Sequence, residues 1–383
     1  MDHAATTYAA PEVVEAMLPY FSEKFGNPSS VYSIGQENKA VIDTTRAKVA
    51  AAINAEPNEI YFTAGGSESD NWVLKGVAFA NLRKGKHIIT TVVEHHAILH
   101  AAEWLQSQGF EVTYLPVDKS GMVSPADVEK AIRPDTILLS VMYANNEIGT
   151  IQPIAEIGAI AQAYGIYFHT DAVQAVGHVP IDVKAENIDM LSLSGHKFYG
   201  PKGVGALYIR RGVRIQNLIH GGAQESRHRA GTENVPGIVG LGAAIERAVR
   251  EMPTESARLT AMRDHLIAEL CKIPASHLNG HPVRRLPNNV NITFEYIEGE
   301  SIVMLLNMFG ICASTGSACN SESLKPSHVL TAIGVPHEIS HGSVRLTLGK
   351  LNTEEDVSYV LEKLPEIVNK LRSMSPLTPD ELR

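Results

Sequence analysis

The chain has 383 residues, of which 44% are hydrophobic and 20% are charged, and its formal net charge is −9. A chain of this length and composition can bury a large core and is predicted to form two domains, so the composition excludes an intrinsically disordered protein. The acidic balance offers no basic surface for nucleic acid or anionic lipid, and it favours a small-molecule ligand.

The cysteine content and the start of the sequence indicate the compartment. Cys271, Cys312 and Cys319 form no CxxC pair, which argues against a disulfide framework or a zinc ribbon. A reducing compartment, the cytoplasm, is therefore expected. The first residues contain no basic region followed by an apolar one, and no apolar run reaches membrane-spanning length, so we expect a soluble protein without membrane contact.

Short β-rich runs alternate with helical patterns between residues 60 and 209, which is typical of an α/β fold with a mostly parallel central sheet flanked by helices. The expected strands cover residues 60–63, 87–92, 111–115, 137–142, 166–169, 190–193 and 205–209, and the expected helices cover 67–81, 97–108 and 154–164. Ligands bind beyond the carboxyl ends of the strands in such sheets. Residues that follow strands are thus expected to meet at one mouth: Gly66, His95, Asn146, Asp171 and Lys197.

The pattern changes near Pro253, and the remainder is predicted to form a smaller α+β domain. We expect helices at 257–272, 301–309 and 354–374, and strands at 290–294 and 311–313. The large domain is predicted to cover residues 11–252, and the small one residues 1–10 and 253–383. Residues 314–327 are polar and contain glycine and serine, which predicts a mobile loop that carries Cys319.

Asp171 ends one apolar strand and Lys197 follows the next. An acid and a lysine in these positions are what pyridoxal 5′-phosphate requires, because the lysine supplies the Schiff base and the carboxylate holds the proton of the ring nitrogen. Cys319 lies on a polar segment where a thiol can ionise, and a thiolate attacks sulfur well. Most single thiols are inert, as is expected for Cys271 inside a helix.

The run from Thr63 to Ser69 joins a strand to a helix. Its amides and the Ser67 hydroxyl could hold a phosphate at the positive end of that helix. The alternative is an ordinary glycine turn with Ser67 as the N-cap. Arg345 lies between apolar residues and could bind a substrate carboxylate with both arms of its guanidinium group, or it could be an edge-strand arginine paired with an acid.

His95, at the end of a strand, is placed to lie over a planar cofactor and to move protons near neutral pH, although a loop histidine is usually only solvated. His96 and His100 stand one helical turn apart. No third metal ligand follows at a spacing typical of zinc sites, so no metal site is predicted.

Six motifs in order closely resemble those of the cysteine desulfurases, a group within the class-V aminotransferase family. Residues 294–300 and 319–330 resemble the nitrogen-fixation type most of all. The match spans nearly the whole chain, and the motifs are Asp2-His3-Ala4-Ala5-Thr6-Thr7, Gly26-Asn27-Pro28-Ser29-Ser30, Asn145-Asn146-Glu147, Ser194-Gly195-His196-Lys197, Arg229-Ala230-Gly231-Thr232 and Gly316-Ser317-Ala318-Cys319. The chain departs from the family pattern at Gly66-Ser67, where Ala-Thr is commoner. This difference is expected to change the site little, because an amide and a hydroxyl are kept.

This resemblance implies a homodimeric pyridoxal phosphate enzyme of fold type I, with its active site near the subunit interface. Lys197 would bind the cofactor, Asp171 would pair with its ring nitrogen, Gln174 with its ring hydroxyl, and His95 would stack on the ring. The resemblance further assigns the phosphate to Gly66, Ser67, Ser194, His196 and the partner subunit's Thr232, and the substrate carboxylate to Asn146 and Arg345.

The reaction implied is the conversion of L-cysteine to L-alanine, with the sulfur kept as a persulfide on Cys319. The sulfur would pass to an acceptor protein, which could be an iron–sulfur or nitrogenase cluster scaffold or a tRNA thiolation protein. Two alternatives stay open: another pyridoxal phosphate enzyme, such as a selenocysteine lyase or an aminotransferase, or a sulfur-carrier scaffold without catalysis.

Overall fold

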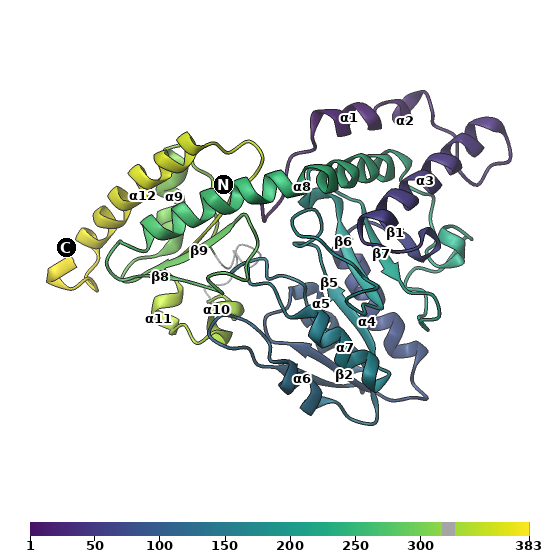
Figure 1. Ribbon diagram of the computed structural model, residues 1–383, viewed down its shortest axis with the longest axis horizontal. Helices are drawn as coiled ribbons and strands as arrows, with labels where there is room; N and C mark the ends of the chain where they lie inside the picture. Colours follow the sequence, from purple (N-terminus) through teal and green to yellow (C-terminus); the bar gives the residue numbers. More distant parts are fainter. Residues whose placement is uncertain (316–325, 383) are drawn as a thin grey trace.

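The computed structural model describes residues 1–315 and 326–382, and its larger part is built on a seven-stranded sheet (Figure 1). The strand order is β1-β7-β6-β5-β4-β2-β3. The strands are β1 (Ile60–Thr63), β2 (His87–Thr91), β3 (Glu111–Leu115), β4 (Thr136–Ser140), β5 (Tyr167–Asp171), β6 (Met190–Ser194) and β7 (Gly205–Ile209). Strands β2 to β6 pair in parallel, and β7 is antiparallel to both its neighbours. The predicted α/β fold with a mostly parallel sheet is confirmed.

Helices cover both faces of this sheet. Every residue of β4 and β6 is therefore buried, and these apolar strands have packing partners on each side. One hydrophobic core lies between the sheet and α4 (Gly66–Ala80) and α5 (His96–Ser107), and it contains Trp72 and Leu105. A second core, with Val49 and Leu241, fills the other face. The helices there and around the edge are α1 (Pro11–Met17), α2 (Pro19–Ser22), α3 (Ser33–Ala52), α6 (Pro125–Ala131) and α7 (Ile154–Tyr164).

A three-stranded antiparallel sheet, ordered β10-β9-β8, forms the smaller part and has its own core around Leu266, Ile292 and Leu364. Its strands are β8 (Ser276–Leu278), β9 (Asn289–Phe294) and β10 (Ser343–Thr347), and its helices are α9 (Gly299–Met308), α10 (His328–Ala332), α11 (His337–Ser340) and α12 (Glu354–Met374). The expected smaller α+β part is therefore present. Short 3-10 turns occur at η1 (Pro57–Glu59), η2 (Gly195–Lys197), η3 (Glu225–Arg227) and η5 (Asp380–Leu382).

The strand expected at 311–313 is wrong. Among the described residues of this segment, Ser314 alone pairs with β10, through a single bridge to Arg345. Asp2 forms a second bridge to β10, at Thr347. The amides of His3 and Ala4 also bond to Thr347, which holds the start of the chain against β10. Of the loop expected at 314–327, residues 316–325 lie outside the described residues, and Ser327 caps α10.

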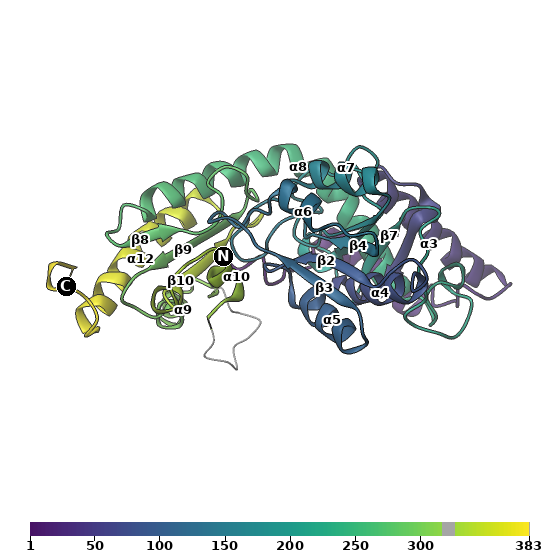
Figure 2. The same cartoon turned by 90° about the horizontal axis from the view of Figure 1, so that it is seen from below.

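A single long helix, α8 (Val235–Leu270), runs past both sheets (Figures 1 and 2). The sequence pattern instead predicted a change near Pro253 and a helix that begins only at Ala257, and a proline inside a helix removes one helical hydrogen bond. Here Pro253 is exposed, and the carbonyl four residues earlier belongs to Val249, whose side chain is 42% exposed, so water can replace the lost donor. The expected boundary at 252 falls inside this helix, and the division into two domains stays a prediction.

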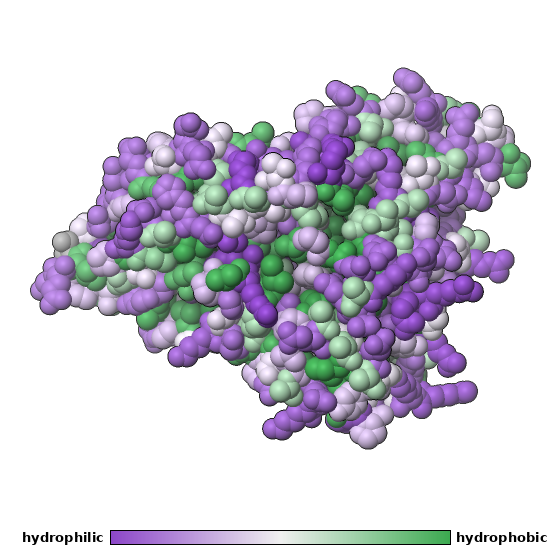
Figure 3. Space-filling view, in the orientation of Figure 1, coloured by the Kyte–Doolittle hydropathy of each residue, from purple (hydrophilic) through white to green (hydrophobic). Residues whose placement is uncertain are grey.

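Figure 3 shows hydrophilic side chains over most of one face, with apolar side chains gathered toward its middle, where the two sheets approach each other. In the part of the chain that the structure describes, no helix has both the length and the apolar character that crossing a membrane requires.

Candidate active site

Ten of the twelve predicted site residues line one cavity of about 280 Å³ beyond the carboxyl ends of the parallel strands. They are Gly66, Ser67, His95, Asn146, Asp171, Gln174, Ser194, His196, Lys197 and Arg345. Thr232 is exposed and does not line the cavity. Cys319 lies outside the described residues. The convergence of strand ends that the sequence predicts thus gathers these side chains.

One end of the cavity is suited to a phosphate group. Helix α4 starts there with Gly65 as its N-cap, and no side chain caps it, so the alternative in which Ser67 is the cap does not apply. Free amides at a helix start bind anions. Gly65 has a φ of 152°, a region that favours glycine. A Cβ at Gly66 would lie 2.5 Å from Cγ2 of Val173, so the glycine gives Val173 its space.

His196 borders the same end of the cavity. Its Nδ1 lies 3.0 Å from the Thr6 hydroxyl. Burial, with smaller contributions from Lys197 and Lys202, lowers the pKa of His196 to about 4. The imidazole is therefore neutral at physiological pH, and it would contact a phosphate through a hydrogen bond and not through a charge.

Lys197 lies in η2, directly after β6, and is held by the first residues of the chain. Its Nζ donates to the carbonyl of Ala4 at 2.6 Å and to that of Ala5 at 2.9 Å. The Gln174 side-chain amide also donates to the Ala4 carbonyl, at 3.0 Å. Backbone oxygens thus orient the amine at the cavity.

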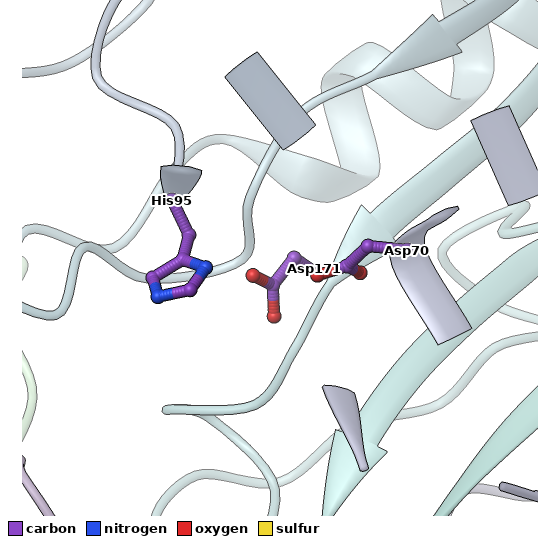
Figure 4. A group of neighbouring side chains, drawn as sticks. All are labelled: Asp70, His95 and Asp171. Atoms are coloured by element: carbon purple, nitrogen blue, oxygen red, sulfur yellow. The ribbon is translucent and has the colours of Figure 1, made fainter. Parts of the chain in front are cut away.

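Asp171 and His95 face each other across the cavity (Figure 4). Asp171 ends β5, and its Oδ1 accepts a hydrogen bond from the Val173 amide at 2.9 Å. Burial raises the pKa of Asp171, whereas His95 and Lys197 act to lower it. His95 caps α5 by accepting from the Ala97 amide through Nδ1, and burial lowers its pKa. The ring is thereby fixed in place, and its other nitrogen remains for the cavity.

Arg345, from β10, brings the smaller sheet to this cavity. Its Nη1 donates to the Asn146 carbonyl at 2.9 Å, and its Nη2 bonds to Asp2 at 3.1 Å. Its buried Nε has no hydrogen-bond partner among the described residues. Arg345 thus pairs with an acid, as one of the two readings expects, and it also lines the cavity. Its binding of a substrate carboxylate stays a prediction.

Six residues that line the cavity were not among the predicted site residues, namely Ala4, Ala5, Asp70, Met142, Ala144 and Val173. Asp70 lines the cavity although it is only 1% exposed, and Val173 closes the wall beside Gly66. The position of Asp70 could have been found, because it lies four residues after Gly66 and therefore on the same face of the helix. His96 and His100, by contrast, have stacked rings with centroids 5.0 Å apart.

Glu94 is a buried acid directly before His95, and it leads to a prediction about pH. Its Oε1 accepts from the Thr91 hydroxyl at 2.7 Å and from the Met142 amide at 3.0 Å, and burial raises its pKa to about 8. The contribution of Glu94 to the free energy of unfolding is fully present at pH values below its pKa in the unfolded chain, near 4.5. This contribution is lost as the pH rises toward 8, the pKa in the folded protein.

We expect the free energy of unfolding of the wild type to fall between pH 5 and pH 8 by on the order of 3 kcal/mol more than that of Glu94→Gln. The amide cannot ionise, so it removes this part of the pH dependence. Urea unfolding at both pH values measures the difference. Parallel pH dependences of the two proteins would show that Glu94 is already ionised at low pH.

Comparison with known proteins identifies the family. The aminotransferase class-V family matches residues 1–360. A cysteine desulfurase IscS of Methanosarcina thermophila is 69% identical over 383 residues, covering 100% of this chain and 95% of the relative. One from Clostridium botulinum is 61% identical over 386 residues and covers 100% and 97% of the two chains. The chain belongs to the cysteine desulfurases of the class-V aminotransferase family.

Solved structures agree with this family assignment. A protein described as NifS-like superposes with a TM-score of 0.91 at 41% identity, covering 97% of this chain and 99% of its own. SspA in complex with cysteine gives a TM-score of 0.81 at 42% identity, covering 91% and 97%. The predicted fold type I and the predicted pyridoxal phosphate cofactor are confirmed, since class-V aminotransferases are enzymes that use this cofactor.

The residues of the cavity fit such a cofactor. The uncapped start of α4 suits its phosphate, and the Asp171 carboxyl group suits its ring nitrogen. Asp70 and Arg345 each have a buried polar atom without a partner in the described chain. A cavity with unsatisfied donors and acceptors is suited to a polar ligand that supplies the missing partners.

Proposed function

We propose that this enzyme is a cysteine desulfurase that converts L-cysteine to L-alanine and keeps the sulfur as a persulfide on Cys319. The observation that carries the proposal is the single cavity in which an amine, a buried carboxyl group, a ring-facing histidine and an arginine converge. Bound pyridoxal phosphate supplies an electron sink for the carbon chemistry. The protein supplies the binding, the orientation and the proton transfers.

The residues of the cavity divide the tasks of this reaction among them. Lys197 would anchor the cofactor, and its amine would accept a proton from the substrate carbon. Asp171 holds the ring nitrogen, with the Val173 amide fixing the carboxyl group in place. His95 covers the ring and moves a proton at the substrate thiol. The phosphate is held at the start of α4 together with Ser194 and His196.

The sulfur step belongs to Cys319. Its thiolate attacks the substrate sulfur, so that a sulfur–sulfur bond forms and the carbon–sulfur bond breaks. The electron pair of the broken bond passes to the carbon skeleton, which takes up protons and leaves as alanine. Because only the thiolate reacts well, the thiol must stay reduced, and this favours the cytoplasm as the compartment.

We further propose a homodimer that delivers sulfur to an iron–sulfur cluster scaffold protein. The exposed Thr232 outside the cavity supports a dimer in which this residue reaches the phosphate of the partner subunit. The names of the relatives support the sulfur chemistry. A nitrogenase cluster scaffold or a tRNA thiolation protein is the alternative acceptor.

The test is the product ratio from L-cysteine. Purified protein loaded with cofactor, in the presence of a thiol reductant, is expected to release alanine and sulfide in equal amounts. An aminotransferase would instead form a keto acid and require an amino acceptor, and a selenocysteine lyase would release alanine from selenocysteine alone. A non-catalytic carrier would release no alanine, and any of these three results would overturn the proposal.

Arg345 provides a test of substrate binding. Arg345→Lys keeps the positive charge but loses the planar fork, so we expect KM for L-cysteine to rise by about 10- to 100-fold with a smaller change in kcat. Steady-state alanine formation measures both constants. Arg372→Lys is a matched control, since Arg372 is also buried but bonds to backbone carbonyls of Pro274, Ala275 and Glu295, away from the cavity. An unchanged KM in Arg345→Lys would reject the assignment.

A further inference from the structure

Asp70 is a buried acid for which the proposed mechanism has no task. It lies on α4, one turn after Gly66, and lines the cavity behind Asp171 (Figure 4). One oxygen of Asp70, one oxygen of Asp171 and a ring nitrogen of His95 all lie within 4.8 Å of one another. Two carboxylates this close in a buried site repel each other strongly, so they cannot both be ionised without a large cost.

The surroundings of the two carboxyl groups differ. Asp171 accepts a hydrogen bond from the Val173 amide, and His95 and Lys197 stabilise its charged form. Asp70 has a bond from the Ser192 hydroxyl, but its Oδ1 has no hydrogen-bond partner among the described residues. No lysine or arginine of residues 1–315 and 326–382 forms an ion pair with it. The environment thus favours charge on Asp171 and disfavours it on Asp70.

The remaining neighbours of Asp70 do not compensate a charge. From β5, Asp70 is faced by Asp171 and His169. From the segment between β2 and α5, it is faced by Glu94 and His95. Lys197 lies on the side of Asp171. His169 comes closest, with Nε2 3.7 Å from Asp70 Oδ1. Burial lowers the pKa of His169 to about 3, so this ring is neutral, and it bonds to the hydroxyls of Ser140 and Ser192.

We propose that Asp70 is the protonated member of an acid–carboxylate pair and acts as a positioning residue that leaves the single negative charge of the pair on Asp171. This inference rests on the proposed function in one respect, namely that Asp171 faces the ring nitrogen of the cofactor. A neutral Asp70 fills the space behind Asp171 without competing for that nitrogen. Burial and the Asp171 charge both raise the pKa of Asp70 well above its usual value, in agreement with this assignment.

Infrared spectroscopy tests the protonation state directly, because a neutral carboxyl group has a C=O stretching band that a carboxylate lacks. Glu94 is expected to give such a band as well, and Glu147, with a pKa raised to about 7 by burial, is mostly ionised at pH 8. The comparison is therefore Glu94→Gln against Glu94→Gln with Asp70→Asn, as full-length holoenzymes at pH 8. We expect one carboxyl C=O band to disappear on replacement of Asp70, and identical spectra would overturn the proposal.

A second measurement covers the case in which the double variant does not fold. Cofactor-free wild type and Asp70→Asn are unfolded with urea between pH 5 and pH 8. A raised pKa in the folded state makes stability fall as pH rises above about 4 toward that pKa, and the asparagine lacks this contribution. The midpoint concentration of urea should therefore fall less with pH in Asp70→Asn than in the wild type. An equal or steeper fall in the variant would show that Asp70 is ionised throughout.

These outcomes are separate from the test of the proposed function. If the wild type releases no alanine from L-cysteine, the desulfurase assignment fails while the infrared band remains interpretable. If alanine is released but the band persists in the Asp70→Asn background, only the inference about Asp70 fails. An Asp70 that is ionised and only structural would change stability alike at pH 5 and pH 8, and its replacement would not remove a carboxyl band.

Discussion

Replacement of Lys197 by alanine is expected to lower kcat for alanine release by about a thousandfold or more, because the variant loses both the cofactor anchor and the group that moves the substrate proton. The two backbone carbonyls of Ala4 and Ala5 would then lose their donor. The cavity itself should persist, since its walls come from strands and helices packed on two hydrophobic cores. Single-turnover alanine formation and the visible absorbance of the bound cofactor measure the effect.

Lys202→Ala is the matched control for this experiment. Lys202 is exposed and lies five residues further along the same segment. Its removal should leave alanine release within about twofold of the wild type, as for most surface substitutions. If Lys197→Ala released alanine at the wild-type rate, the anchor would have to be another residue.

Cys319→Ser is expected to reduce sulfide release and alanine formation by about a thousandfold or more, because a hydroxyl group does not replace a thiolate as a nucleophile toward sulfur. Cofactor binding should be retained, since Lys197, Asp171 and the start of α4, which are proposed to hold the cofactor, are unchanged. The expected result is a protein that binds L-cysteine and changes the cofactor spectrum but accumulates no persulfide. Labelling with sulfur-35 cysteine, followed by gel filtration without reductant, detects the protein-bound sulfur.

The two other cysteines provide the controls. Cys271 and Cys312 are free, exposed thiols, and their serine variants should keep the labelled persulfide. Retention of label in Cys319→Ser together with its loss in either control would move the nucleophile to that other cysteine.

Much of the fold was predictable because the sheet strands are apolar on both faces. The bounds of β1, β3, β7 and α12 agree with the expected ranges, since turn residues or a capping box mark their ends. The expected helix at 154–164 ends where Gly165 adopts a left-handed conformation with a φ of 64°. The parallel order then brings His95, Asp171 and Lys197 to one edge of the sheet.

The errors have identifiable causes. The pattern around Pro253 indicates a helix end, but the exposed side of α8 tolerates the proline. Strand β8 has three residues with little apolar character, and it exists because β9 offers it a partner. Asp70 was missed because an acid within a helix is usually solvated, and only the packing of α4 on the sheet buries it. Such effects depend on neighbours that are distant in the sequence.

The first residues of the chain bond to Thr347 of β10 and, a few positions later, to the Lys197 amine. A tilt of the small sheet relative to the large one would therefore stretch this short tether and draw the carbonyl acceptors away from the amine. The same short segment therefore sets both its own position on the small sheet and the positions of the acceptors that hold the amine.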